Sequence, residues 1–168
     1  MTTHRRSILG FATVPDAGGD VFFEPYDVKA ANDAWKRLVA VFNDTSSRKG
    51  LRGAFNVPKD YVGAPKIIVV WTAIATTGNV EWDFDYRAVG GNDTESLDQA
   101  GTQESVNVPD AAPSLAHERL EAVLALTAAN LAADDTLLFE LFRDGVDAGD
   151  TMAAAAIVHD VLFEYSDA

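Results

Sequence analysis

The chain has 168 residues, no cysteine and a formal net charge of −13. This length is typical of a single domain and allows a full hydrophobic core without cross-links. The lack of cysteine excludes disulfides, zinc–thiolate sites and thiol nucleophiles. The negative charge opposes binding to nucleic acid or to anionic membranes, and no segment has the roughly 18 consecutive apolar residues of a membrane-spanning helix.

Charge is divided unevenly along the chain. Residues 1–66 carry ten Lys or Arg and seven Asp or Glu, a net of +3, whereas residues 67–168 carry three and nineteen, a net of −16. This asymmetry is compatible with simple solubility. It also fits a molecule with one mildly basic face and one acidic face, which could stack head to tail or dock on a charged scaffold.

Residues 1–20 are expected to form a loosely held N-terminal arm. The pair Arg5-Arg6 is reminiscent of a twin-arginine signal, but the apolar stretch behind it, residues 8–14, is broken by a glycine and is too short for a signal core. We therefore expect the mature protein to start near its first residue. Residues 21–168 are then expected to form one β-sandwich domain.

Two short apolar runs follow, at residues 38–42 and 54–57, and both predict strands. Asn43-Asp44 ends the first run and Pro58 ends the second. The first run lies within residues 34–43, which contain good helix formers, so a helix is the competing assignment for this segment.

The central part of the chain predicts a β-hairpin. Residues 66–74 (KIIVVWTAI) are dense in β-branched side chains, as in a strand buried on both faces. In residues 80–87 large apolar side chains alternate with charged ones, which predicts a strand with one face in the core. The dipeptide Gly78-Asn79 between the two is typical of a hairpin turn. The charged face, expected in solvent or against a partner, consists of Glu81, Asp83, Asp85 and Arg87.

Three further segments complete the predicted strands. Residues 114–133 contain helix formers, yet their leucines also fit alternation, so a strand followed by a turn at residues 127–130 is favoured over a helix. Residues 137–142 (LLFELF) form another apolar run. The last strand alternates over residues 157–165, and one of its faces is expected to consist of Ile157, His159, Val161, Phe163 and Tyr165.

About eight strands with short polar connections and no helical crossovers predict an all-β protein. The expected architecture is an antiparallel β-sandwich of the jelly-roll type.

The sequence predicts no catalytic residue, no cofactor site and no metal site. His4, His117 and His159 lack the spacing of zinc ligands, and no nucleophile elbow is present. His159 is expected at the edge of the core with its ring nitrogens hydrogen-bonded. Asp83 and Asp85 could pair as glycosidase carboxylates, but the solvated face of a strand is the favoured interpretation.

Two acidic loops and three tryptophans are further candidates for ligand binding. The acidic loops lack the alternate-residue spacing of the helical calcium loop, so calcium is disfavoured there. A sugar could stack on an exposed tryptophan; Trp71 and Trp82 are expected in the core, which leaves Trp35 as the freer candidate. The candidate oxygen ligands of one loop are Asn92, Asp93 and Glu95. Those of the other loop are Asp144, Asp147 and Asp150.

Several segments resemble small β-sandwich virion proteins of tailed bacteriophages. They are residues 35–44 (WKRLVAVFND), 54–62 (AFNVPKDYV), 66–71 (KIIVVW), 80–86 (VEWDFDY) and 138–144 (LFELFRD), together with the loop at 147–151 and the final strand to Tyr165. The resemblance implies a jelly-roll subunit that trimerises and decorates a capsid, or that serves in the tail. Residues 1–20 would then hook neighbouring subunits.

On this basis the expected function is structural and not enzymatic. We expect a homotrimeric capsid decoration (cement) protein, made in the host cytoplasm and seated on the capsid exterior of the virion, where it contacts the major capsid protein or another virion protein. No cofactor, nucleic acid or membrane is expected as a partner. The alternative is a tail or fibre accessory protein or a receptor-binding module that recognises glycans.

Overall fold

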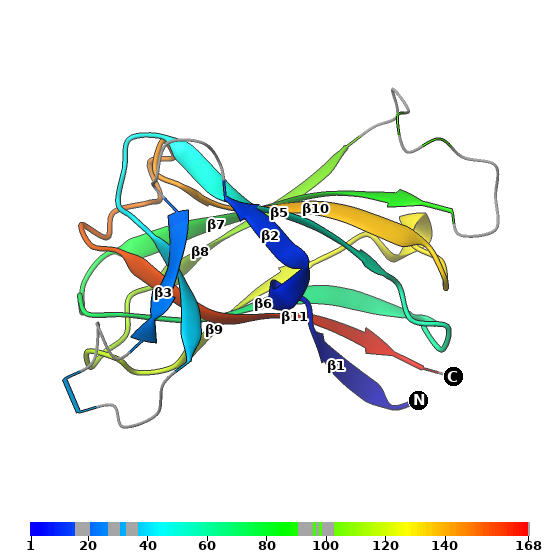
Figure 1. Ribbon diagram of the computed structural model, residues 1–168, viewed down its shortest axis with the longest axis horizontal. Coiled ribbons are helices and arrows are strands. Elements are labelled where there is room, and N and C mark those ends of the chain that lie inside the picture. Colours follow the sequence, from blue (N-terminus) through cyan, green and yellow to red (C-terminus); the bar gives the residue numbers. More distant parts are fainter. Residues whose placement is uncertain are drawn as a thin grey trace.

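The computed structural model is a sandwich of two antiparallel β-sheets (Figure 1). It describes residues 1–15, 21–26, 31–32, 37–90, 96, 98 and 103–167, with the backbone alone for residues 11–15. The predicted all-β antiparallel sandwich is thereby confirmed. Short 3-10 turns lie at η1 (Leu9–Phe11) and η3 (Ala128–Asn130). Within the described residues, no helix is both long and apolar enough to cross a bilayer.

The described residues form eleven strands, where the sequence predicted about eight. The six-stranded sheet has the order β3 (Val21–Pro25), β4 (Leu38–Phe42), β11 (Ala156–Ser166), β6 (Gly63–Ala73) and β9 (Leu120–Ala125), with β1 (Thr3–Ser7) also paired to β11. The five-stranded sheet has the order β2 (Ala12–Pro15), β5 (Arg48–Asn56), β10 (Thr136–Asp144), β7 (Asn79–Val89) and β8 (Glu104–Ala111). The strands β1, β2 and β3 are too short or too polar to show alternation.

The core lies between the two sheets, and two tryptophans meet at its centre. Trp71 of β6 and Trp82 of β7 are both fully buried, and their rings cross edge to face with centroids 5.7 Å apart. The indole Nε1 of Trp71 donates a hydrogen bond to Asp110 Oδ2 at 2.7 Å. The prediction that both tryptophans belong to the core is confirmed, so neither is available as a sugar platform.

The predicted hairpin between β6 and β7 is wrong, although both strands are present. β6 pairs with β11 and β9, whereas β7 pairs with β10 and β8, so the two strands belong to different sheets. Residues 74–78 therefore cross from one sheet to the other, a distance of about 10 Å that five extended residues span easily. Gly78, with φ of +91°, makes the turn that the sequence indicated.

Residues 3–15 differ from the expected loose arm. β1 pairs with β11 along its whole length, and β2 pairs with β5. Between these strands Ile8 is 1% exposed, and its N–H donates to Val161 O at 2.7 Å. The sequence did not predict β1 as a strand, because its side chains are polar and its pairing with β11 rests on backbone hydrogen bonds rather than on an apolar face.

The last strand contains a register shift that the sequence did not reveal. Pairing with β6 slips between Val158 and Asp160, as in a β-bulge, so the inward face changes phase there. Val161 and Phe163 point into the main core, whereas Ile157 packs into a second cluster with Val39, Val41 and Tyr26 on the opposite face. The prediction that Ile157 shares one face with Val161, Phe163 and Tyr165 is therefore wrong for Ile157.

The alanine-rich segment is a strand, as favoured from the sequence. β9 pairs with β6, and its side chains Ala122 and Leu124 enter the core. The turn expected after it is the 3-10 turn η3.

Candidate ligand-binding groove

A groove lies on the outer face of the five-stranded sheet, over its strands β5, β10 and β7. In the register of the sheet Glu140 pairs with both Arg52 and Asp85, so these three side chains lie in one row on one face. The groove has a volume of about 280 Å³. Its lining is completed by Gly53, Tyr86, Arg87, Gln103, Leu138 and Phe139.

Arg48 of β5 binds two carboxylates of β7, those of Asp83 and Asp85. Its Nε donates to Asp83 Oδ2 at 2.9 Å and its Nη2 donates to Asp85 Oδ2 at 2.8 Å. The guanidinium lies over the ring of Phe142, with Cζ 3.8 Å from the ring centroid. Arg48 and Phe142 thereby shield this part of the charged face of β7 from solvent.

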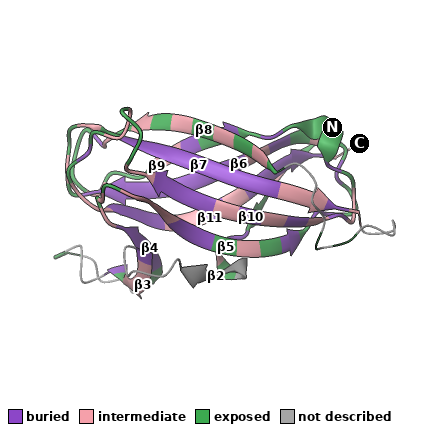
Figure 2. Cartoon of the chain, turned by 90° about the horizontal axis from the view of Figure 1, so that it is seen from above, coloured by how far each residue is buried: buried purple, intermediate pink, exposed green. Residues whose placement is uncertain are grey.

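Asp83 and Asp85 are consequently buried, at 8% and 5% exposure. Figure 2 shows this as the nearly continuous buried colour along β7, where the inward and outward side chains are both covered. The prediction that these carboxylates face solvent is wrong. β7 is flanked by β10 and β8, and Arg48 reaches across from β5.

Asp85 presents an unused hydrogen-bond acceptor beside the groove. Its Oδ2 is bound by Arg48, whereas its Oδ1 is buried and has no hydrogen-bond partner among the residues that the structure describes. A buried acceptor left unpaired costs about 1–3 kcal/mol. Because Oδ1 is enclosed, a ligand in the groove can donate to it only after the side chains around it shift.

The charges that line the groove are balanced. Arg52 and Arg87 supply two positive charges, Asp85 and Glu140 supply two negative ones, and Arg52 Nε lies 2.8 Å from Glu140 Oε1. Planar guanidinium, carboxylate and amide groups offer donors and acceptors at fixed angles. The lining therefore suits a neutral ligand with several hydroxyl groups better than a strongly charged one.

Two carboxyls of β7 outside the groove lining, Asp83 and Glu81, are shifted toward their neutral form. Burial raises the pKa of Asp83, against the opposing effect of Arg48. Burial also raises the pKa of Glu81, and the hydrogen bond from Asn107 Nδ2 offsets this only in part while Asp147 adds to it. Both groups take up a proton at a higher pH than an exposed carboxyl does.

Asp83 and Asp85 are not arranged as a glycosidase pair. A glycosidase places its two carboxyls on either side of the scissile bond. Here both carboxyls project from the same face of one strand and share the guanidinium of Arg48. This arrangement can bind a ligand from one side, and it offers no second group across the ligand.

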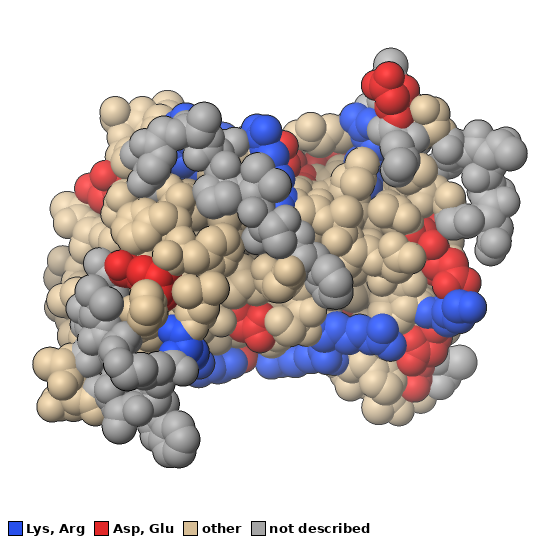
Figure 3. Space-filling view, viewed as in Figure 1, with Lys and Arg blue, Asp and Glu red and all other residues tan. Residues whose placement is uncertain are grey.

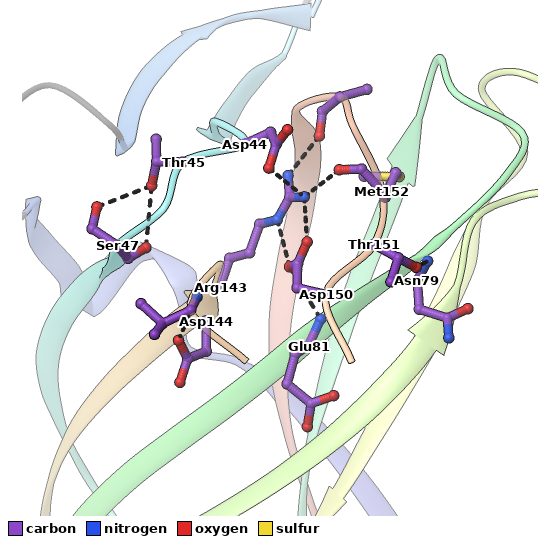
Figure 4. A network of polar contacts seen from close by, with 12 residues as sticks. Asp44, Thr45, Ser47, Asn79, Glu81, Arg143, Asp144, Asp150, Thr151 and Met152 are labelled. Atoms are coloured by element: carbon purple, nitrogen blue, oxygen red, sulfur yellow. Dashed lines mark hydrogen bonds and ion pairs between the residues drawn. The ribbon is translucent and has the colours of Figure 1, made fainter. Parts of the chain in front are cut away.

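The acidic loop before β11 serves local structure. Asp150 forms a two-pronged ion pair with Arg143, and Figure 4 shows the two side chains facing each other. Asp144 Oδ1 accepts from the N–H of Val146, and Asp147 Oδ1 accepts from the N–H of Gly149. In the described parts of the chain no group of three His, Asp or Glu is placed to hold a metal ion. Four residues considered from the sequence lie outside the described residues: Trp35, Asn92, Asp93 and Glu95.

The three histidines lie at two separate places. His4 stacks on Tyr165 at the chain ends, with centroids 5.2 Å apart. His117 and His159 both contact Tyr26: the Tyr26 hydroxyl lies 3.1 Å from His117 Nδ1, and the His159 ring meets the Tyr26 ring edge to face at 4.5 Å. None of the three lines the groove.

Sequence reasoning missed the residues that β5 and β10 contribute to the groove, Arg52 and Glu140. A signal was present, since Arg48 and Arg52 have the even spacing of one strand face. The strand predicted there begins only at residue 54 and so excludes both arginines.

No protein-family model matches this sequence, and no curated protein matches it either. Among solved structures the fold is similar to that of a CBM35 from Cellvibrio japonicus, with a TM-score of 0.51 and 9% identity over 99% of this chain and 95% of that one. It is also similar to a family 6 carbohydrate-binding module, with a TM-score of 0.50 and 8% identity over 97% of this chain and 94% of that one. At such identities the likeness is one of fold. The jelly-roll sandwich implied by the resemblance to virion proteins is thus shown, whereas a phage origin is not.

Proposed function

We propose that this chain is a non-catalytic carbohydrate-binding module and that the groove over β5, β10 and β7 holds the sugar. The observation that carries this proposal is the groove itself, whose lining combines two arginines, two carboxylates and one amide side chain with no net charge. Sugar hydroxyls can donate to such carboxylates and accept from such guanidinium groups. Fold similarity to carbohydrate-binding modules is compatible with the proposal and does not by itself identify a ligand.

The ligand class follows from the lining. Arg52 and Arg87 can donate to ring or hydroxyl oxygens, while Asp85 and Glu140 can accept from hydroxyls. Because these charges cancel, a neutral oligosaccharide fits better than a uronic acid polymer or a sulfated one. Leu138 supplies an apolar contact for a pyranose face.

The test is isothermal titration calorimetry against a panel of neutral oligosaccharides built from xylose, glucose, galactose and mannose. The variant Asp85→Asn keeps the shape of the side chain but removes the charge of the acceptor. We expect it to weaken binding at least about tenfold, which corresponds to about 1.4 kcal/mol.

The matched control is Asp83→Asn, on the same strand, on the same face and bound to the same arginine, but outside the groove lining. It should leave the affinity unchanged. Equal effects of the two substitutions would place the ligand elsewhere, and lack of binding to every sugar of the panel would refute the proposal.

A capsid decoration protein remains a second proposal, as a homotrimer on the exterior of a virion. The observation that bears on assembly is exposed apolar surface, since Leu38, Ile74 and Leu115 are 62%, 54% and 72% exposed. Such residues support an interface where they form one contiguous patch. The mass of the protein in solution, measured together with its binding to empty capsids, tests this role. A monomer that does not bind capsids would exclude it.

Basic and acidic side chains pair with each other across the two halves of the sequence. Basic residues of the first part of the chain pair with acidic residues of the second part within one molecule, as Arg5 does with Glu164 and Arg52 with Glu140. Figure 3 accordingly shows Lys and Arg next to Asp and Glu at several places on one face of the molecule. On this face the basic and acidic residues are therefore intermingled rather than separated.

A further inference from the structure

The groove over β5, β10 and β7 continues to the edge of its sheet at β8. Its lining contains Arg52 of β5, Glu140 of β10, Arg87 of β7 and Gln103, the residue directly before β8. These four strands are successive neighbours in the sheet, as Figure 2 shows. Because neighbouring strands lie about 4.8 Å apart, the backbones of Arg52 and Gln103 are separated by about 14 Å across the sheet.

The groove runs across the strands rather than along them. In the strand register Leu138 lies opposite Arg87, and the pairing of β7 with β8 brings Gln103 to the other side of Arg87. A parallel row leads from Arg52 to Glu140. Paired residues point to the same face of a sheet, so a ligand that contacts all of these side chains must cross four strands.

The groove is shallow for its length. Its volume of about 280 Å³ lies below the usual range for an enclosed small-molecule site. The side chain of Arg52 at one end is 53% exposed and Gln103 at the other end is exposed as well, whereas Leu138 and Arg87 between them are half-buried. β8 is the last strand of its sheet in the described part of the chain, so no further strand closes that end. This shape suits a long ligand that lies on the face of the sheet better than a small ligand that is enclosed.

We propose that the groove binds an internal segment of a linear glycan chain, with about three sugar units lying in a row across the strands. The proposal rests on the proposed sugar binding and adds the length and the direction of the ligand. A pyranose ring in an extended chain is about as long as the spacing between strands, about 4.8 Å, so a row of about three rings reaches from β5 to β8. Arg52 binds this segment at one end and Gln103 binds it at the other.

The side chains along the groove provide contacts for each ring of such a segment. The guanidinium of Arg52 donates to ring and hydroxyl oxygens, whereas the amide of Gln103 can both donate to a hydroxyl and accept from it. Between them Leu138 offers an apolar surface and Arg87 offers further donors. Because every added ring gains contacts of its own, the affinity should grow with chain length until the groove is filled.

Chain length is tested by calorimetry of the full chain with linear β-1,4-linked oligosaccharides of xylose, glucose, galactose and mannose, each with one to six units. In a series that binds, each unit up to about the third should tighten binding about fivefold to tenfold, as one or two added hydrogen bonds would, and units beyond about the fourth should add less than about twofold. Reduction of the terminal sugar of the hexasaccharide to its alditol should leave the affinity unchanged, because the ends of the chain lie outside the groove.

Two substitutions locate the ends of the segment. Arg52→Met and Gln103→Ala should each weaken tetrasaccharide binding about tenfold. A disaccharide spans only about two strand spacings, about 10 Å, and cannot reach both residues, so at least one of the two substitutions should leave its affinity unchanged. The matched control is Asn107→Ala, an exposed amide on the same face of β8 outside the groove lining, which should change neither affinity. Circular dichroism confirms that each variant folds.

The outcomes separate this proposal from the proposed function. A monosaccharide that binds as tightly as its hexasaccharide, or a hexasaccharide that no longer binds as the alditol, would overturn the internal segment and leave sugar binding intact. Equal losses of disaccharide and tetrasaccharide affinity in both end variants would overturn it too, because they would indicate a general distortion of the groove. Lack of binding in all four series would refute the sugar binding itself, and this proposal with it.

Discussion

Arg143 and Asp150 form an ion pair in which both side chains are 2% exposed. The Nη2 of Arg143 lies 2.7 Å from Asp150 Oδ1 and its Nε lies 2.8 Å from Asp150 Oδ2. The same guanidinium donates to the carbonyl oxygens of Met152 and Ala154 (Figure 4). One side chain at the end of β10 thus holds the loop that leads into β11.

Replacement of Arg143 by alanine should be strongly destabilising. It removes the counter-charge of Asp150 and the side-chain donor to two carbonyl oxygens, and breaking a buried pair in this way typically costs about 3–5 kcal/mol. Urea denaturation measures the change in the free energy of unfolding. As a control, Arg119→Ala removes an exposed arginine paired with Glu121 and should cost less than about 1 kcal/mol. Similar losses in the two variants would contradict this account.

Glu81→Gln should stabilise the protein at pH 7. Burial raises the pKa of Glu81 in the fold, so its ionisation costs free energy that the unfolded chain does not lose. Glutamine removes the charge and can still accept from Asn107 Nδ2. The gain should vanish below about pH 4, where Glu81 is protonated in both states. Urea denaturation curves of the wild type and the variant, at pH 7 and below about pH 4, measure this gain in the free energy of unfolding.

Glu164→Gln is the control, because it should change the free energy of unfolding at pH 7 in the opposite direction. Burial alone would raise the pKa of Glu164, but hydrogen bonds from Lys66 and Arg5 outweigh it and lower the pKa. The charged form therefore contributes stability above the unfolded pKa of about 4.3, and this contribution disappears as the pH falls through the folded pKa. Glu164→Gln should destabilise the protein at pH 7 and lose its effect in acid. The same sign for Glu81 and Glu164 would refute the assignment.

Gly78→Ala should destabilise the crossing between the sheets. Gly78 has a φ of +91°, and an added Cβ would lie 2.7 Å from the Cα of Met152. The backbone conformation alone costs an alanine about 1–2 kcal/mol, and the contact adds to this. Gly10→Ala is the control, because no heavy atom lies within 4 Å of a Cβ there. A normal melting temperature for Gly78→Ala would show that the crossing can rearrange.

Ile8→Ala should cost about 2–5 kcal/mol, the usual range for a buried aliphatic side chain. This result would distinguish an integral segment from a dispensable arm. In the exposed control, Leu115→Ala, the loss should be below about 0.5 kcal/mol. Equal stabilities of the wild type and the Ile8 variant, measured by thermal unfolding, would mean that residues 1–15 are held loosely after all.

The strands could be predicted better than their partners. Alternation around Trp82 identifies a strand and its inward face, but the same pattern arises whether the next strand lies beside it or across the core. The pattern therefore predicts a hairpin at a place where the chain crosses from β6 in one sheet to β7 in the other. The bulge near His159 was equally hidden, because a one-residue insertion leaves the composition of a strand unchanged.

The groove was largely beyond prediction for a different reason. An aspartate on the outward face of a strand is solvated by default. Asp85 is buried because Arg48, distant in sequence, reaches over it across β10. Only the three-dimensional pairing of β5, β10 and β7 brings these charges together.

The pairing of β1 with β11 determines how the protein responds to a pulling force. The two strands are antiparallel and Thr3 lies opposite Ser166, so the two ends of the described chain emerge side by side. Tension applied between them loads one pair of hydrogen bonds at a time and peels β1 away, instead of shearing many bonds at once. Ile8 would leave the core next, and the sandwich would open from this corner at low force.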